Sequence, residues 1–167
     1  MMMRFQRFAL IRLWCPILSL FPGMGLMSDR MFVDSNLWLY AFICQPGEDS
    51  KHAKARELVE KPVRYVVSEQ VIAEVSANLL RKAGIENAHL MRLVESFYGR
   101  CQVVTPCLDL HRRANGLREK HYLSFWDSLI VAAALEAGCN TLLTEDMQHG
   151  LMVEDQLSVL NPLRELA

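Results

Sequence analysis

Short apolar runs alternate along this chain with longer stretches of helical spacing, and that alternation limits the folds it can adopt. The apolar runs are typical of buried strands: residues 31–34, 63–68, 101–106, 140–144 and a last piece at 157–163. The stretches between them suit helices: residues 35–43, 51–60, 69–84, 87–99, 108–121 and 124–138. Strands that alternate with helices form a parallel sheet covered on both faces. We therefore expect an α/β fold of three layers, with a central parallel sheet flanked by helices.

The size and composition of the chain fit one globular domain. It has 167 residues, of which 51% are hydrophobic and 22% charged, a balance that argues against disorder and allows a sizeable core. No internal repeat or linker interrupts the pattern, so we expect one domain over residues 31–163. The formal net charge of −1 excludes a globally basic nucleic-acid binder, although a local basic patch is enough for such binding.

The cysteines indicate a reducing compartment. They are scattered along the chain at Cys15, Cys44, Cys101, Cys107 and Cys139. They form no C-x-x-C pair, and the cysteines and histidines lack the spacing of zinc ligands. We interpret them as reduced thiols and expect a cytoplasmic protein.

Residues 1–30 stand apart from this pattern. They combine a basic start with an apolar middle, as a signal peptide does, but Arg12 interrupts the apolar run and no A-x-A-like site follows. The run is also short for a membrane span, so we expect no stable membrane association. We interpret the segment as an N-terminal extension produced by a start codon assigned too early, with translation beginning near Met27 or Met31. A membrane-associated helix is the alternative.

Four carboxylates fall where the strands of such a sheet end. Asp34 is the last residue of the first apolar run, and Asp146 lies two residues beyond Thr144, the end of the fourth. Glu74 lies in the second turn of the helix after the second run, and Asp127 in the first turn of the helix before the fourth. Ligands of open parallel sheets bind beyond the carboxyl ends of the strands. We therefore expect the four acids to converge at one edge.

Each acid also has an ordinary structural interpretation. Asp34 suits the N-cap of the next helix, and Glu74 is placed like a solvated residue at the border of an apolar stripe. Asp127 follows Ser124 at the spacing of a capping box, S-x-x-[DE]. Asp146 fits an ordinary turn. Taken singly, none of the four acids indicates catalysis.

Taken together, the four acids predict a metal site. Four like charges at close range would repel one another and raise some of their pKa values, and a divalent cation removes that conflict. Carboxylate oxygens with water suit Mg²⁺ or Mn²⁺, whereas the lack of clustered histidines and thiolates argues against zinc. Such a carboxylate site is typical of phosphoryl-transfer hydrolysis, in which metals activate water and stabilise charge on the phosphate.

Four segments, in this order and at these separations, resemble the PIN-domain ribonucleases of the VapC toxin group: FVDSNLWLY, VSEQVIAEV, SFWDSLIVAAAL and LLTEDMQHG. The resemblance runs from about Met31 to Leu163 and implies that the three-layer fold is PIN-like. The last two segments are fairly specific motifs, whereas the first two are weak in isolation. The residues 1–30 are a departure that the family pattern does not need.

The resemblance carries roles onto individual residues. Its acidic positions fall on the four acids named above, with Asp34, Asp127 and Asp146 implied as metal ligands. Glu74 is implied to bind a second metal or to orient the attacking water. Asn36 falls on the polar position that supports the first aspartate, and Thr144 falls on the small hydroxyl position beside the site. Ser124 is expected to help position the acid of its helix.

The resemblance also implies an activity and partners. It implies a Mg²⁺- or Mn²⁺-dependent endoribonuclease that hydrolyses phosphodiester bonds of structured RNA and leaves a 5′-phosphate. It further implies a homodimer and a cognate VapB-type antitoxin that covers the acidic groove. The densest cluster of candidate RNA-binding residues is Arg112, Arg113, Arg118 and Lys120, beside His121. A solvated helix face is the ordinary interpretation of such a run of charges.

Other functions are open at this point. A PIN-like binding module without catalysis would keep the architecture and lose the metal site, although the full set of acids counts against it. A different acid-site nuclease or phosphohydrolase is another alternative, such as a flap-type DNA nuclease or a haloacid-dehalogenase-like phosphatase. The latter needs D-x-D after its first strand, where this chain has DSN at residues 34–36. A membrane-tethered protein that uses residues 1–30 is the third.

Overall fold

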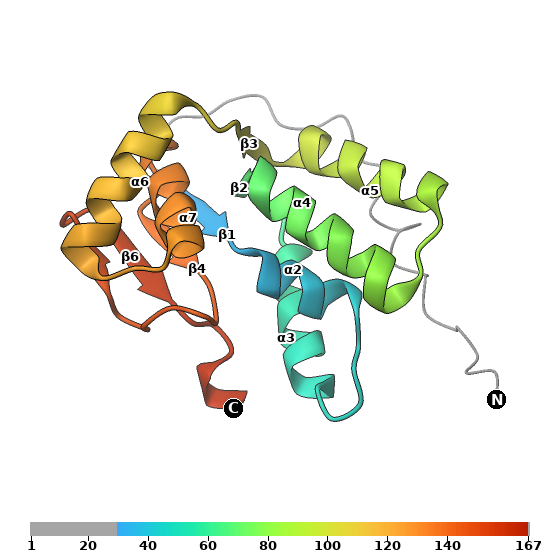
Figure 1. Ribbon diagram of the computed structural model, residues 1–167. Helices are drawn as coiled ribbons and strands as arrows, with labels where there is room; N and C mark the ends of the chain where they lie inside the picture. Colours follow the sequence, from blue (N-terminus) through green and yellow to red (C-terminus); the bar gives the residue numbers. More distant parts are fainter. Residues whose placement is uncertain (1–29, 167) are drawn as a thin grey trace.

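Six strands form one sheet in the computed structural model, which describes residues 30–166 of the chain (Figure 1). Their order is β3-β2-β1-β4-β6-β5, and all neighbours are parallel except β5 and β6. The strands are β1 (Met31–Val33), β2 (Val66–Ser68), β3 (Gln102–Val104), β4 (Thr141–Leu143), β5 (Met152–Val153) and β6 (Leu157–Leu160). The expected α/β fold with a central parallel sheet is confirmed.

Helices cover both faces of this sheet. They are α2 (Ser35–Phe42), α3 (Asp49–Val59), α4 (Glu69–Asn78), the π-helical turn η1 (Leu79–Ala83), α5 (Asn87–Arg100), α6 (Leu108–His121), α7 (Phe125–Glu136) and the short 3-10 helix η2 (Arg164–Leu166). Figure 1 shows α6 and α7 on one side of the sheet and α4 and α5 on the other. α7 packs against β2 and β4, and all its residues from Ser128 to Leu135 are buried.

The structure differs from the sequence-based expectations in two places. Met152 and Val153 form an extra edge strand, antiparallel to β6, and the turn that follows has positive φ at Glu154 and Asp155. A strand of two residues is too short to show the alternation that identifies strands. The helix expected over 69–84 ends in a π-helical turn, a rare form that residue propensities do not indicate.

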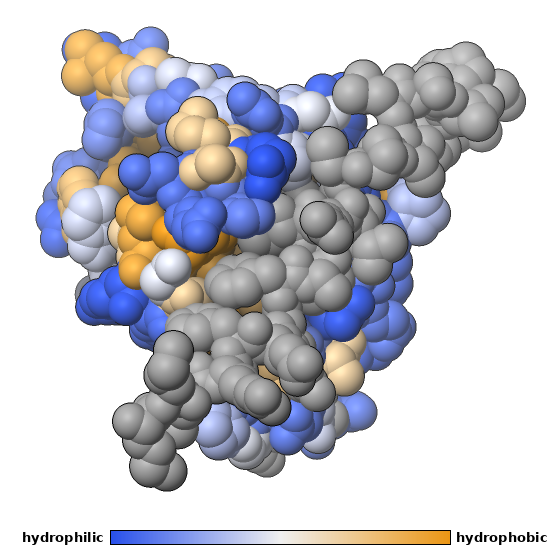
Figure 2. Space-filling view, turned by 90° about the vertical axis from the view of Figure 1, so that its right-hand side faces the viewer, coloured by the Kyte–Doolittle hydropathy of each residue, from blue (hydrophilic) through white to orange (hydrophobic). Residues whose placement is uncertain are grey.

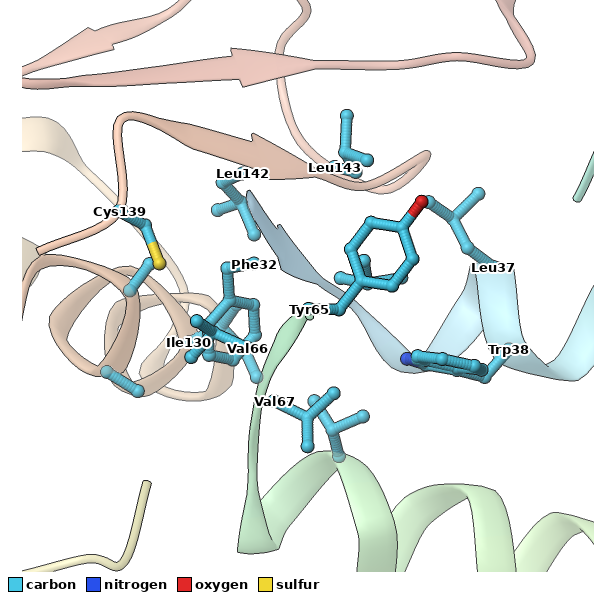
Figure 3. Close-up of a cluster of buried hydrophobic side chains, with 14 of the residues drawn as sticks. Phe32, Leu37, Trp38, Tyr65, Val66, Val67, Ile130, Cys139, Leu142 and Leu143 are labelled. Atoms are coloured by element: carbon cyan, nitrogen blue, oxygen red, sulfur yellow. The ribbon is translucent and has the colours of Figure 1, made fainter. Parts of the chain in front are cut away.

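The core lies on both sides of β1. Phe32 is the middle residue of β1 and is in register with Val66 of β2 and Leu142 of β4. Figure 3 shows these three side chains grouped with Ile130 of α7, whereas Trp38 of α2 lies away from them, beyond β1. Alternate residues of a strand point to opposite faces, so burial on both faces explains why the strands are almost wholly apolar.

The surface is consistent with this core. Hydrophilic residues cover much of the described face seen in Figure 2, and hydrophobic ones gather in a few places. Between residues 30 and 166, no helix combines the length and apolar character needed to cross a membrane. The interpretation of residues 1–30 as an extension concerns residues that, apart from Arg30, lie outside those described.

Candidate active site

The site begins where the central strands β1 and β4 end. The amide of Asp34 donates a 3.0 Å hydrogen bond to the carbonyl of Leu143, and the amide of Thr144 donates one of 3.0 Å to the carbonyl of Leu160. These bonds continue the strand pairing by one residue beyond each strand. Asp34 and Thr144 are therefore held side by side at the carboxyl edge of the sheet.

Asp34 is a buried carboxylate, with only 6% of its surface exposed. Its Oδ2 accepts a 2.8 Å hydrogen bond from the hydroxyl of Thr144, and its Oδ1 accepts one of 2.7 Å from the amide of Ser35, as the N-cap of α2. Burial raises the pKa of Asp34 to about 6, although these two bonds lower it. The charges of Glu74 and Asp146 raise the same pKa further, so the three acids lie within electrostatic reach of one another.

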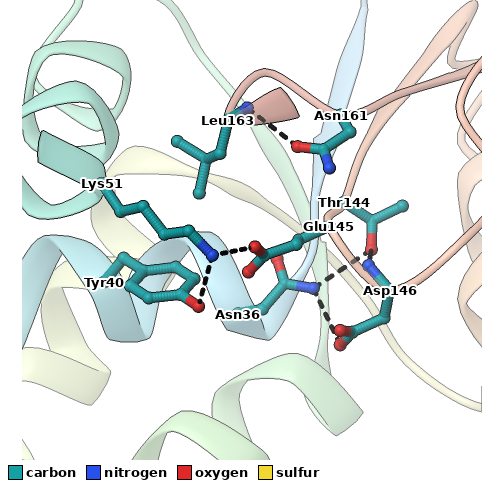
Figure 4. A network of polar contacts seen from close by, with 8 residues as sticks. All are labelled: Asn36, Tyr40, Lys51, Thr144, Glu145, Asp146, Asn161 and Leu163. Atoms are coloured by element: carbon teal, nitrogen blue, oxygen red, sulfur yellow. Dashed lines mark hydrogen bonds and ion pairs between the residues drawn. The ribbon is translucent and has the colours of Figure 1, made fainter. Parts of the chain in front are cut away.

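Asn36 joins Asp34 to Asp146. Its Nδ2 donates to Oδ2 of Asp146 at 3.0 Å and to Oγ1 of Thr144 at 3.1 Å (Figure 4). It also donates more weakly to Oδ2 of Asp34, at 3.3 Å. The amide of Asp146 also donates to Oγ1 of Thr144, at 3.1 Å. One amide and one hydroxyl thus set the spacing of the two aspartates.

Glu74 reaches the site from α4. Its Oε2 accepts a 2.7 Å hydrogen bond from the hydroxyl of Ser35, and its Oε1 accepts one of 2.9 Å from Nε2 of Gln70. Asn78 adds a 2.9 Å bond to the backbone carbonyl of Glu74. Glu74 is half-buried, as expected at the border of an apolar stripe, and α2 packs on α4 and brings Ser35 to it.

Asp127 lies in the first turn of α7, the end of the helix opposite Ala137. Nη1 of Arg30, just before β1, donates a 2.9 Å hydrogen bond to the carbonyl of Ala137, which holds the end of α7 at the amino edge of the sheet. Asp127 lies 10 residues before Ala137 in the chain, which corresponds to about 15 Å along the helix axis. Asp34 follows Arg30 by four residues, or about 13 Å of strand. The antiparallel run of α7 therefore brings Asp127 to the carboxyl edge.

Only half of the predicted capping box forms at Asp127. Its amide donates a 3.1 Å hydrogen bond to Oγ of Ser124, the N-cap of α7. The reciprocal bond, from the amide of Ser124 to the carboxylate of Asp127, is absent from the described structure, because an aspartate is one methylene shorter than the glutamate of the usual motif. No hydrogen bond or ion pair within residues 30–166 joins the Asp127 carboxylate to the other acids, so the structure brings this residue to the edge without direct contact.

Two of the four basic candidates lie away from this edge. Arg113 pairs with Glu154 at 2.9 Å and with Glu136 at 3.9 Å. Glu136 is the last residue of α7, at the opposite end from Asp127. Arg112 pairs with Asp109 of its own helix at 2.8 Å. These contacts fit the ordinary interpretation of the charge run as a solvated helix face.

The other two basic candidates lie near the start of α7, although the pKa of Glu154 is lowered by the hydrogen bond from Arg113 and also by the charge of Lys120. Arg118 and Lys120 belong to the last turn of α6, which packs along α7 and is joined to its start by a short turn at 122–124. Both side chains are exposed. The last turn of α6 therefore lies beside the first turn of α7, at the carboxyl edge of the sheet.

Sequence reasoning did not identify the ion pair between Lys51 and Glu145, which borders the site (Figure 4). Both side chains are 20% exposed. Lys51 also donates a 3.4 Å hydrogen bond to the hydroxyl of Tyr40. Glu145 stands between Thr144 and Asp146 in the chain, so Lys51 of α3 holds the turn that carries Asp146.

Sequence reasoning also did not identify Ser35 and Gln70, the two residues that donate hydrogen bonds to the Glu74 carboxylate. Gln70 lies four residues before Glu74, a spacing at which helical side chains meet.

The donor atoms at this site fit a hard divalent cation. Carboxylate, amide and hydroxyl oxygens are the ligands that Mg²⁺ prefers, and it usually keeps several waters and takes one or two carboxylates. Within residues 30–166, however, no cluster of three or more His, Cys, Asp or Glu side chains is placed to hold a metal, so the expected convergence of the four acids into one cluster is not observed. Oδ1 of Asn36 is buried without a partner, beside acids whose charges raise the pKa of Asp34. A cation would coordinate the oxygen of Asn36 and offset the negative charge of these acids.

Known proteins share this fold. The chain resembles VapC20 of Mycobacterium tuberculosis, a sarcin–ricin loop cleaving toxin, with a TM-score of 0.54 and 24% identity over 67% of this chain and 86% of that one. It also resembles a toxin–antitoxin complex from Klebsiella pneumoniae, with a TM-score of 0.60 and 17% identity over 80% of this chain and 98% of that one. Comparison with curated protein sequences gives no match.

A family model extends this likeness to the sequence itself. The model of the PIN domain matches residues 31–150, which is most of the chain. The matched stretch includes all four predicted acids: Asp34, Glu74, Asp127 and Asp146. The resemblance inferred from the sequence motifs is thereby confirmed, and the chain belongs to the PIN-domain family.

Proposed function

We propose that the chain is a metal-dependent endoribonuclease of the VapC toxin type, which hydrolyses phosphodiester bonds of structured RNA. The observation that carries the proposal is the buried Asp34 carboxylate, bonded to Thr144 and lying near the charges of Glu74 and Asp146. In a PIN-domain chain, this arrangement supports the proposal of a catalytic cation at the same place. Of the two structural relatives named above, one is a sarcin–ricin loop cleaving toxin and the other is a toxin–antitoxin complex.

The acids at the carboxyl edge would hold Mg²⁺ or Mn²⁺. Asp34, Asp127 and Asp146 are the proposed ligands, directly or through water. The bound ion would supply a more acidic water and stabilise negative charge on the phosphate. Asn36 and Thr144 keep Asp34 and Asp146 oriented, so little reorganisation is needed when the site is filled.

Glu74 is the proposed acceptor of the proton from the attacking water, or a ligand of a second metal. Both of its carboxylate oxygens accept hydrogen bonds, from Ser35 and Gln70, so its position is defined. Asp34 has a pKa of about 6 and is therefore mostly ionised at pH 7 even without a cation. The proposed site thus carries negative charge at neutral pH and repels phosphate until a cation or basic residues offset it.

Proposed partners follow from the same assignment. A VapB-type antitoxin would cover the acidic groove, and the relative from Klebsiella pneumoniae was solved as a toxin–antitoxin complex. We also propose a homodimer and a cytoplasmic location. Co-expression with the small reading frame adjacent to this gene, followed by copurification, tests for the antitoxin.

The test of the function is RNA cleavage by the purified chain. Structured RNA is incubated with the protein and Mn²⁺, and the ends of the fragments are sequenced and tested for 5′-phosphate. We expect discrete cuts that EDTA prevents and that Asp34→Asn reduces at least about 100-fold, because the variant loses a metal ligand. Asp109→Asn, which changes an exposed acid on α6, serves as the matched control for charge.

Three results would contradict this function. Equal cleavage by the parent chain and by Asp34→Asn would point to a contaminating nuclease. Cleavage that persists in EDTA would exclude a metal-dependent reaction. RNA binding without cleavage, in the presence of Mg²⁺ or Mn²⁺, would favour the inactive binding module instead.

A further inference from the structure

The turn between α6 and α7 exposes three aromatic side chains. Tyr122 is 95% exposed, Phe125 54% and Trp126 60%. The rings of Phe125 and Trp126 meet edge to face, with their centroids 5.1 Å apart. Leu123, the aliphatic residue of the same turn, packs against the core instead. The turn therefore presents aromatic surface to the outside while its aliphatic side chain is largely inside.

The backbone holds this aromatic pair in place. Tyr122 ends α6 in the left-handed conformation, with φ of 56°, and Ser124 caps the next helix. Phe125 and Trp126 then form the start of α7, whose following residues are buried in the core. A surface on a rigid helix loses little conformational freedom when a ligand binds.

The pair borders the proposed active site. Asp127 follows Trp126 directly in the chain, in the first turn of α7, toward the carboxyl edge of the sheet. Phe125 and Trp126 are therefore displaced from Asp127 by roughly 1.5–3 Å along the helix axis, on the side that leads away from the sheet. Because neighbouring residues of a helix point in different directions, a ligand bound at the acids would meet these rings only if it extended past the start of α7.

Positive charge lies on the last turn of α6, which a short turn joins to the aromatic pair. The charge of Lys120 there also adds to the hydrogen bond from Arg113 in lowering the pKa of Glu154. Arg118 and Lys120 are exposed in the last turn of α6, and in the described part of the chain neither belongs to an ion pair. Exposed aromatic rings beside basic side chains are the means by which proteins bind unpaired nucleotides, with bases on the rings and phosphates on the cations.

We propose that Phe125 and Trp126 form a stacking surface for an unpaired base of the RNA substrate, with Arg118 and Lys120 near its phosphates. This proposal rests on the proposed ribonuclease function and specifies its substrate: a loop or single-stranded segment next to the cut bond. Bases within a duplex are already stacked on one another and do not offer a free face. The rings therefore select for unpaired RNA without reading its sequence.

The experiment measures RNA binding separately from cleavage. Two labelled RNAs are compared: a hairpin with 2-aminopurine in its loop, and a fully paired duplex of the same length. Binding is measured on the Asp34→Asn chain with Mg²⁺ present, so that the RNA is not cut. Into this chain are introduced Phe125→Ala with Trp126→Ala, the conservative pair Phe125→Tyr with Trp126→Phe, and Tyr98→Ala. Tyr98 is 53% exposed and lies on α5, on the other side of the sheet.

We expect the double alanine variant to bind the hairpin at least about five-fold more weakly and to lose the quenching of 2-aminopurine, because one stacked base is lost. Its affinity for the duplex should change less than about two-fold, since duplex bases do not stack on protein rings. The conservative pair and Tyr98→Ala should bind the hairpin as the Asp34→Asn chain does. If the double alanine variant fails to fold, Trp126→Ala alone is used.

Unchanged hairpin affinity, or an equal loss for hairpin and duplex, would overturn the stacking surface. So would failure of the Asp34→Asn chain to bind either RNA. A change of oligomeric state in the double alanine variant would also overturn it, by assigning the rings to contact between copies of the chain. Failure of the proposed function gives a different pattern: the hairpin binds with quenching, yet the chain of natural sequence never cuts it.

Discussion

The hydroxyl of Thr144 donates a 2.8 Å hydrogen bond to Oδ2 of Asp34, across 110 positions of sequence. This bond joins the residues that follow the two central strands. It also opposes the effect of burial on the pKa of Asp34. The electrostatics of the proposed metal site therefore depend on a neutral hydroxyl as well as on the acids.

Replacing Thr144 tests this bond. Thr144→Val keeps the shape of the side chain but removes the donor to Asp34 and the acceptor of the Asp146 amide. We expect the pKa of Asp34 to rise, and RNA cleavage to need a higher pH than in the parent. The free energy of unfolding should fall by about 1–3 kcal/mol, because buried polar groups lose partners. Thr144→Ser should restore both the pH profile of cleavage and the melting temperature.

Burial of Asp34 predicts a pH dependence of stability without metal. The pKa rises from 3.8 to about 6 on folding. Below pH 4 the carboxyl is protonated in both states, and from pH 4 to 6 the folded state binds the proton more tightly. As pH rises over this range, the free energy of unfolding should therefore fall by about 3 kcal/mol because of this group. Urea unfolding in EDTA should show Asp34→Asn gaining on the parent as pH rises through this window; a difference constant with pH would contradict it.

Metal binding predicts a change in melting temperature. Because only the folded chain would assemble the acids, Mn²⁺ at about 100 times its dissociation constant should add about 2.7 kcal/mol of stability, a shift of several degrees. Asp146→Asn should reduce this shift, whereas Asp109→Asn should keep it. The measurement is a thermal melt with increasing Mn²⁺ at neutral pH. A shift that survives in both Asp34→Asn and Asp146→Asn would place the ion elsewhere.

Replacing Ser124 should lower stability, whereas replacing Asp127 should lower RNA cleavage. Ser124→Ala removes the acceptor of the Asp127 amide and should cost about 1 kcal/mol of stability. Asp127→Asn leaves that bond in place, so its melting temperature without metal should match the parent while cleavage falls. The opposite result, lost stability with normal cleavage, would make Asp127 a structural residue.

The pair of Lys51 and Glu145 should position the turn before Asp146. Lys51→Met leaves Glu145 partly buried without its cation, and we expect a loss of about 1 kcal/mol, since the pair is still partly exposed to solvent. Glu145→Gln and the double variant complete a cycle that isolates the energy of the pair. Additive effects would show that the two side chains do not stabilise each other.

The positions of the strand ends could be predicted from the sequence. Asp34 and Thr144 each follow a short apolar run, and the carboxyl ends of parallel strands meet at one edge. The cap formed by Ser124 was likewise local, because it needs only the spacing of a helix start. Residues placed by the end of a strand or the start of a helix can therefore be predicted from the residues next to them in the chain.

The contacts between helices could not be predicted in this way. Ser35 bonds to Glu74 across 39 positions, and Lys51 pairs with Glu145 across 94. Both depend on how α2 and α3 pack against the rest of the chain, which periodicity does not specify. The same limit applies to the basic residues of α6, since the pairing of Arg113 with Glu154 required the unpredicted hairpin of β5 and β6.

The bond from the Asp34 amide to the carbonyl of Leu143 bears on how the molecule opens. β1 and β4 are interior strands with a neighbour on each side, whereas β5 is at the edge. Interior hydrogen bonds break only in large openings, while edges fray in small ones. Amide exchange at Asp34 should therefore be among the slowest in the protein. Transient loss of β5 alone, with β6 still paired to β4, would leave the spacing of the proposed catalytic acids unchanged, so changes of sequence in β5 need not alter the chemistry.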